Sequence, residues 1–166
     1  MIVVSDSTPL ISLMKAMKLD ILRDLFGEVL IPEAVYDEVT SNDSHKDEAE
    51  LIVNSDYIRK VNVNNPEKVF FLQRATGLDL GESEAIIYAD ETNADLLLMD
   101  ETAGRKVAQN MNLPMSGSTG ILIQAFQANL LTEEEVKIAF DRIKRSNQHI
   151  SDDLIKYALE IVHSHL

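Results

Sequence analysis

Short apolar segments alternate with longer amphipathic segments along the whole chain, and this order restricts the possible folds more than any other feature. Strand-like apolar runs occur at residues 2–5, 28–31, 57–63, 94–99 and 113–116. Helical periodicity occurs at residues 9–17, 19–26, 32–40, 46–54, 66–76, 82–92, 102–111, 118–129, 133–145 and 151–165. Strands that alternate with helices in this way predict an α/β layered domain around a mainly parallel sheet.

The strand-like runs differ in how apolar they are. Runs 2–5 and 94–99 are almost continuously apolar, which is typical of strands covered by helices on both faces of a sheet. Run 57–63 instead alternates between apolar and polar residues, so we expect it at an edge of the sheet.

Length and residue types favour one compact domain over residues 1–166, because a chain of 166 residues is long enough to bury a single core. Apolar runs long enough to cross a bilayer are absent, so we expect a soluble protein without a membrane anchor. The chain has no cysteine, which excludes disulfides and thiolate metal sites and agrees with a cytoplasmic location.

The net charge of −13 is concentrated in two segments. Residues 33–50 contain seven acids and one base, and residues 79–101 contain eight acids and no base. Solvated helix faces explain most such runs. An RNA partner attracted by its phosphates would favour the opposite sign, so any phosphate-binding site here requires local cations or metal ions.

Two acids follow the apolar strands directly. Asp6 ends the first run, and Asp100, with Glu101 next to it, ends run 94–99. Ligands of open parallel sheets bind at the carboxyl ends of the strands, so these acids are candidate site residues. The alternative is that each acid only caps the following helix, for which Thr8 and Thr102 compete.

Two further acids lie on predicted helices, beside the apolar face of each. They are Glu84, in LGESEAIIYA, and Glu38, in PEAVYDEV. Glu82 can be explained as a negative charge at a helix N-terminus, and Glu38 can be explained as a surface acid. We predict that the side chains of Glu84 and Glu38 lie close to those of the strand-end acids Asp6 and Asp100.

Four converging carboxylates would repel one another unless cations or protons neutralise them. Magnesium and manganese prefer carboxylate oxygens, so we predict an Mg²⁺ or Mn²⁺ site made by Asp6, Glu38, Glu84 and Asp100, with Glu82 and Glu101 as alternative ligands. Ser7, Arg105, Lys106, Ser118 and Thr119 are candidate substrate-binding residues, although capping or solvated surface charge would also explain them.

Several segments together resemble the PIN domain, and in particular the PIN proteins related to VapC-type toxins. They are VVSDSTPLISL (3–13), IPEAVYDEV (31–39), LGESEAIIYA (80–89), LLLMDETAGRKVA (96–108) and SGSTGILIQA (116–125). The resemblance covers most of residues 1–130, and residues 131–166 extend beyond the minimal domain. It implies a three-layer α/β/α fold and a metal-dependent endoribonuclease in which Asp6, Glu38, Glu84 and Asp100 match the four acids of the family.

The same resemblance suggests partners. It implies an RNA substrate, a homodimer, and a toxin role with a basic antitoxin-like protein as partner. Two other hypotheses stay open at this point: a catalytically inactive PIN-like module that binds RNA or protein, and a receiver-like domain phosphorylated on one strand-end acid.

Overall fold

The core of the fold is a sheet of five strands, all parallel in the part of the chain described by the computed structural model, which comprises residues 1–41, 43–146, 148 and 150–165. The strands are β1 (Val3–Ser5), β2 (Val29–Pro32), β3 (Ile58–Val61), β4 (Leu96–Leu98) and β5 (Met115–Ser116). Their spatial order is β3-β2-β1-β4-β5, which confirms the predicted parallel α/β architecture and the edge position of β3.

Helices connect the strands and follow the last one, and their bounds lie close to those of the predicted helical segments. They are α1 (Ser7–Lys15), α2 (Ile21–Phe26), α3 (Glu33–Thr40), α4 (Lys46–Val53), α5 (Pro66–Thr76), α6 (Leu80–Thr92), α7 (Thr102–Asn110), α8 (Ser118–Gln127), α9 (Glu133–Arg145) and α10 (Asp152–Ser164). A short 3₁₀ helix (Asp43–His45) precedes α4. None of the described helices is long and apolar enough to cross a membrane.

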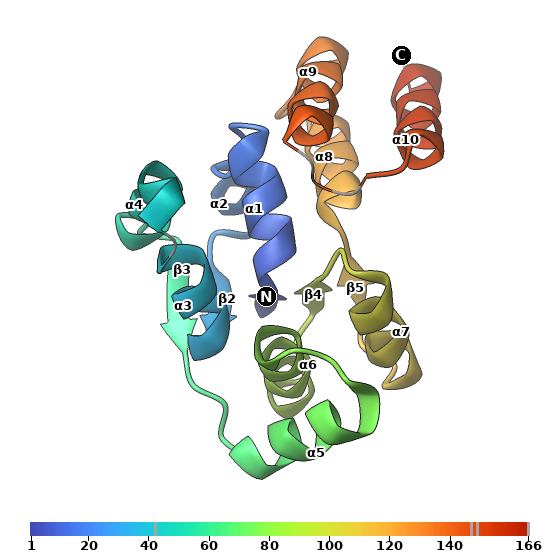
Figure 1. The fold of residues 1–166 in the computed structure, drawn as a ribbon. Coiled ribbons are helices and arrows are strands. Elements are labelled where there is room, and N and C mark those ends of the chain that lie inside the picture. Colours follow the sequence, from blue (N-terminus) through green and yellow to red (C-terminus); the bar gives the residue numbers. More distant parts are fainter. Residues whose placement is uncertain (42, 147, 149, 166) are drawn as a thin grey trace.

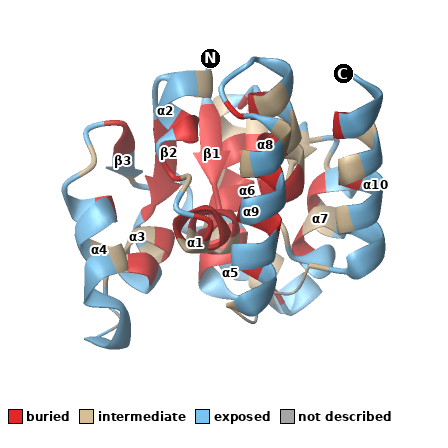
Figure 2. Cartoon of the chain, turned by 90° about the horizontal axis from the view of Figure 1, so that it is seen from above, coloured by how far each residue is buried: buried red, intermediate tan, exposed pale blue. Residues whose placement is uncertain are grey.

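The sheet is covered on both faces, because neighbouring residues of one strand point to opposite sides. Val3 packs into the apolar cluster formed with α1, α2, α3, α8, α9 and α10. Val4 packs into a second cluster with α6 and α7. The protein is therefore a three-layer α/β/α sandwich, with β1 and α1 in its buried centre (Figures 1 and 2).

The last two helices share the core of the domain. Phe140 on α9 and Val162 on α10 belong to the same buried cluster as Leu13 on α1. The start of α9 is fixed by Thr132, whose side chain accepts a hydrogen bond from the backbone N–H of Glu135 at 3.2 Å. Figure 1 shows α8, α9 and α10 gathered at one end of the molecule and α5 at the other.

Candidate active site

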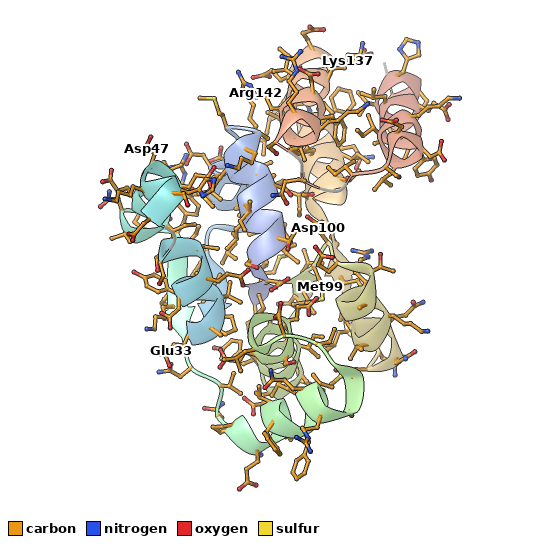
Figure 3. All side chains as sticks on the ribbon, in the orientation of Figure 1. Glu33, Asp47, Met99, Asp100, Lys137 and Arg142 are labelled. Atoms are coloured by element: carbon orange, nitrogen blue, oxygen red, sulfur yellow. The ribbon has the colours of Figure 1, made fainter. Side chains whose placement is uncertain are left out.

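The carboxyl ends of the two central strands bring Asp6 and Asp100 to the same edge of the sheet. Strands β1 and β4 are paired, with Ser5 opposite Leu98. The backbone N–H of Asp6 also donates a hydrogen bond to the carbonyl of Leu98 at 3.0 Å. Each of the two acids follows the end of its strand, as the sequence predicts, and Asp100 lies near the centre of the molecule in Figure 3.

Asp6 is a buried carboxylate that does not act as a simple helix cap. It occupies the N-cap position of α1, yet its side chain makes no capping hydrogen bond. The side chain is almost fully buried, and its Oδ1 atom has no hydrogen-bond partner among the described residues. Burial raises the pKa of Asp6 from 3.8 to about 7, helped by the nearby charges of Asp79, Glu82 and Glu38 and opposed by a hydrogen bond from the Ser7 backbone.

These electrostatic neighbours define the acidic cluster, which consists of Asp6, Glu38, Asp79 and Glu82. Loss of hydration raises the pKa of Glu38, and Asp79 raises it further, while a hydrogen bond from Ser7 works in the opposite direction. The pKa of Glu82 is raised by burial and then by the charges of Asp79 and other acids. The cluster therefore places the buried acids Asp6 and Glu82 beside two acids, Glu38 and Asp79, that are exposed to solvent.

Helix α6 brings two members of the cluster together through its first turn. The side chain of Asp79 accepts a hydrogen bond from the backbone N–H of Glu82 at 2.8 Å, and the side chain of Glu82 accepts one from the backbone N–H of Asp79 at 3.1 Å. This reciprocal capping box explains Glu82 as a helix-start residue. Because Glu82 is also buried beside Asp6, it combines both roles.

Two glycines let other chain segments approach the cluster. A Cβ atom at Gly81 would lie 3.3 Å from Oε2 of Glu38 and 3.5 Å from Oδ1 of Asp79. A Cβ atom at Gly104, in the first turn of α7, would lie 3.3 Å from Oε1 of Glu82. A side chain at either position would crowd these carboxylates, and at Gly104 it would also overlap Sδ of Met99.

Asp100 is held by the start of α8. Its Oδ1 accepts a hydrogen bond from the backbone N–H of Ser118 at 2.7 Å, and its Oδ2 accepts one from the Ser118 hydroxyl at 2.9 Å. Burial raises the pKa of Asp100, the two bonds from Ser118 and the charge of Arg105 lower it, and Glu101 raises it. Glu101 also raises the pKa of Glu82, so its charge acts on both acids.

Glu84 lies elsewhere, in contrast to the sequence prediction. Its Oε2 accepts a hydrogen bond from the backbone N–H of Ala34 at 2.9 Å, at the start of α3. Successive residues of an α-helix are rotated by about 100°, so residues two apart point to nearly opposite sides. The helical acid beside Asp6 is therefore Glu82, and Glu84 satisfies an N–H group that the helix itself leaves unpaired.

The predicted substrate-binding residues have different surroundings. Ser7 is buried beside Glu38. Arg105 donates a hydrogen bond from Nη1 to the carbonyl of Met99 at 2.8 Å, and Lys106 is exposed on α7. Ser118 directs both of its donors to Asp100, so these groups are already used, and the neighbouring Thr119 is buried.

The residue types fit a divalent cation. Every side chain in the acidic cluster is a carboxylate, and Oδ1 of Asp6 is buried without a donor from the described residues, so it has an unused acceptor for an ion. In the described residues, no three His, Cys, Asp or Glu side chains are placed to hold one ion together. Binding would therefore require side-chain rotations of these acids toward Asp6.

Asp79 is the member of the cluster that sequence reasoning missed. The pattern Asp79-x-x-Glu82 is a capping-box signature, and it marks the first turn of a helix. Read together with the strand-end acids, it would have placed both residues at the carboxyl edge of the sheet.

The chain was compared with protein families, curated proteins and solved structures. A protein-family model described as a PIN domain matches residues 2–164 of the chain. No curated protein and no solved structure matches significantly.

Proposed function

This chain belongs to the PIN-domain family, whose members are in general nucleases, and from this premise we propose that it is an Mg²⁺- or Mn²⁺-dependent endoribonuclease. The family match covers residues 2–164 and therefore includes every acid of the candidate site. The choice of RNA as substrate and the metal dependence are parts of the proposal.

One observation supports the proposal most strongly. Asp6 is a buried carboxylate with an unpaired oxygen in the described part of the chain, and the charges that raise its pKa belong to the acids Asp79, Glu82 and Glu38. Such a group costs free energy unless a proton or a cation neutralises it. A metal ion would remove this cost. It would also allow a chain of net charge −13 to bind a negatively charged phosphodiester.

In the proposed reaction, Asp6, Glu38 and Glu82 would hold the cation, and Asp79 would add negative charge to the site. A bound Mg²⁺ or Mn²⁺ would polarise the scissile phosphate and lower the pKa of a water molecule. Asp100 keeps free lone pairs on both oxygens despite its two hydrogen bonds, so it can accept further donors at the site.

In the described part of the chain, a basic side chain lies at this edge of the sheet. Arg105 lies beside Asp100 and is the basic side chain whose charge acts on that acid. We assign to Arg105 the neutralisation of phosphate charge, together with the exposed Lys106 one residue further along α7. Ser7, which donates a hydrogen bond to Glu38, orients that carboxylate.

The proposal includes a toxin role with a basic protein partner and a homodimer, as the resemblance to VapC-type proteins suggests. The acidic segments of the chain suit a basic partner. Induced expression of the wild type, but not of Asp6→Asn, would then arrest bacterial growth, and co-purified RNA would show new ends. Equal growth of both strains would remove the toxin role.

Cleavage of a mixed-sequence RNA in the presence of Mn²⁺ tests the nuclease directly. We expect the wild type to cut, and we expect Asp6→Asn and Glu82→Gln to lose about 100-fold or more of that activity. Equal rates in all three proteins would refute the proposal. The inactive-module alternative makes a separate prediction, namely RNA binding without cleavage in either Mg²⁺ or Mn²⁺.

A further inference from the structure

A pocket lies between the end of β3, helix α5 and the start of α6, and it encloses about 470 Å³. This volume falls within the range of about 300–1,000 Å³ that is typical of small-molecule sites. Phe70 and Leu80 line the pocket with 56% and 48% of their surface exposed, and Val69 beside them is buried. The amide side chains of Asn62 and Gln73 also line it. The pocket therefore combines an exposed aromatic ring with uncharged polar groups.

The pocket adjoins the acidic cluster through helix α6. Asp79 and Glu82, at the start of this helix, belong to the cluster. Leu80 and Glu84, from the same part of the helix, line the pocket. Asn62 follows the carboxyl end of β3, so the pocket lies at the same edge of the parallel sheet as the strand-end acids. Figure 1 shows α5 beside α6, and the two helices are in contact.

The acids among the described residues of the lining are both engaged. Nζ of Lys60 lies 3.0 Å from Oε1 of Glu33, which Figure 3 labels at the start of α3. Oε2 of Glu84 accepts the hydrogen bond from the backbone N–H of Ala34. These contacts compensate part of the negative charge of the lining, so they reduce its repulsion of an anionic ligand.

A cation and two amides accompany the aromatic ring. The guanidinium carbon of Arg74 lies 5.7 Å from the centre of the Phe70 ring. Among the described residues, Arg74 has no acid as a partner, and the side-chain amides of Asn62 and Gln73 have no hydrogen-bond partner. An apolar protein segment over this pocket would leave both amides unpaired, which costs free energy. A nucleobase would satisfy them, because it combines an aromatic face with donors and acceptors along its edge.

We propose that the pocket holds one nucleobase of the RNA substrate, stacked on the ring of Phe70 and hydrogen-bonded by Asn62 and Gln73, with a neighbouring phosphate beside Arg74. The inference rests on the proposed ribonuclease function, since the strand would continue from the acidic cluster along the start of α6. Single-stranded RNA suits this site, because an unpaired base is free to leave its neighbours and stack on an aromatic side chain. The pocket would then select which phosphodiester reaches the acidic cluster.

Photochemical crosslinking tests where the base lies, independently of cleavage. The probe is a single-stranded RNA oligonucleotide that carries 5-iodouridine, irradiated together with the full chain in Mg²⁺. Trypsin cuts after Lys68 and Arg74, so this part of α5 gives a peptide of residues 69–74. We expect mass spectrometry to find the crosslinked nucleotide on this peptide, and to find much less of it in Phe70→Leu.

Cleavage kinetics in Mn²⁺ test what the pocket contributes to substrate binding. Phe70→Leu keeps an apolar side chain but removes the ring, and Phe70→Tyr restores a ring. Phe71→Leu is the matched control, because Phe71 is the next residue of α5, is 67% exposed and does not line the pocket. A second series of substrates lacks one base at each position in turn. Circular dichroism confirms that each variant is folded.

We expect Phe70→Leu to raise KM about tenfold with little change in kcat, because a stacked base contributes equally to binding of the substrate and of the transition state. Phe70→Tyr and Phe71→Leu should change KM less than threefold. Removal of the base at one position should raise KM for the wild type by about the same factor, and it should cause no further rise in Phe70→Leu.

The results separate this proposal from the ribonuclease function itself. Cleavage with equal KM in the wild type and in Phe70→Leu, or with equal rises in KM in Phe70→Leu and Phe71→Leu, would overturn the pocket and leave the nuclease standing. A Phe70-dependent crosslink in a chain that cuts no RNA would support the pocket and refute the nuclease. The absence of a crosslink on residues 69–74, or self-association of the chain that Phe70→Leu abolishes, would also overturn the proposal.

Discussion

Replacing Asp6 by asparagine should stabilise the metal-free protein near neutral pH, although it removes a residue of the candidate site. In the folded chain the pKa of Asp6 is about 7, against an ordinary value of 3.8. A difference of about three pKa units corresponds to about 4 kcal/mol of unfolding free energy, since each unit is worth about 1.4 kcal/mol.

The direction follows from proton binding. Below pH 3.8 the carboxyl is protonated in both the folded and the unfolded chain, so it has no effect on stability. Between about pH 4 and 7 the folded chain binds this proton more tightly, and stability falls as the pH rises. Above about pH 7 the full cost is present. The asparagine of the variant carries no charge, but its buried amide also needs hydrogen bonds, so we expect a net gain of about 1–3 kcal/mol.

Urea denaturation in EDTA, followed by circular dichroism at pH 4.5 and pH 8, measures this difference. The unfolding free energy of Asp6→Asn should clearly exceed that of the wild type at pH 8. The difference should be much smaller at pH 4.5. Glu133→Gln is a useful contrast, because Lys137 lowers the pKa of the half-buried Glu133, so loss of that charge should bring no gain. A variant that is no more stable than the wild type at pH 8, or a gain that does not depend on pH, would refute the reasoning.

Four further substitutions test other parts of the structure. Glu82→Gln should reduce Mn²⁺-dependent RNA cleavage about 100-fold. Glu84→Gln keeps an acceptor for the N–H of Ala34, so it should change the cleavage rate less than threefold. Equal losses in the two variants would contradict the assignment of Glu82 to the site. Gly117→Ala should lower the cleavage rate about tenfold or more, because the added Cβ would lie 2.5 Å from Oδ1 of Asp100 and displace that carboxylate. An unaltered rate would show that cleavage does not require Asp100 in its position beside Ser118. Thr132→Ala should cost about 1 kcal/mol in urea denaturation by removing the cap of α9, and an unchanged midpoint would exclude that cap.

The fold could be predicted from the sequence because its signals are local. Each strand is a short apolar run, and several helices begin at recognisable caps such as Thr132. The boundary at α1 was less accurate. Pro9 at the first helical position favoured a start after Thr8, whereas the helix begins at Ser7, with Asp6 at its N-cap position.

The choice between Glu82 and Glu84 could not be made from periodicity. Helix α6 is buried almost all round, as Gly81, Ala85, Ile86 and Ile87 show, so no single apolar face indicates which acid points toward Asp6. The outcome depends on α3, which presents the N–H of Ala34 to Glu84. That contact joins residues 50 positions apart, and local sequence does not reveal it.

The role of Asp100 depended on a similarly distant contact. The sequence predicts its place at the end of β4, but the partner that orients it, Ser118, lies 18 residues away on α8. The same bond removes the donors of Ser118 from the set available to a phosphate. Side-chain pairs of this kind are set by tertiary packing, so they become visible only when the sheet places β4 beside β5.

The central claim is that the acidic cluster around Asp6 binds a divalent cation. Electron paramagnetic resonance of free Mn²⁺, measured at 0.15 M salt during a titration, counts the ions bound by the wild type and by Asp6→Asn. We predict at least one site in the wild type that is weakened tenfold or more in Asp6→Asn, while weak binding to the remaining surface acids is unchanged. Identical Mn²⁺ binding curves for the two proteins would contradict the claim.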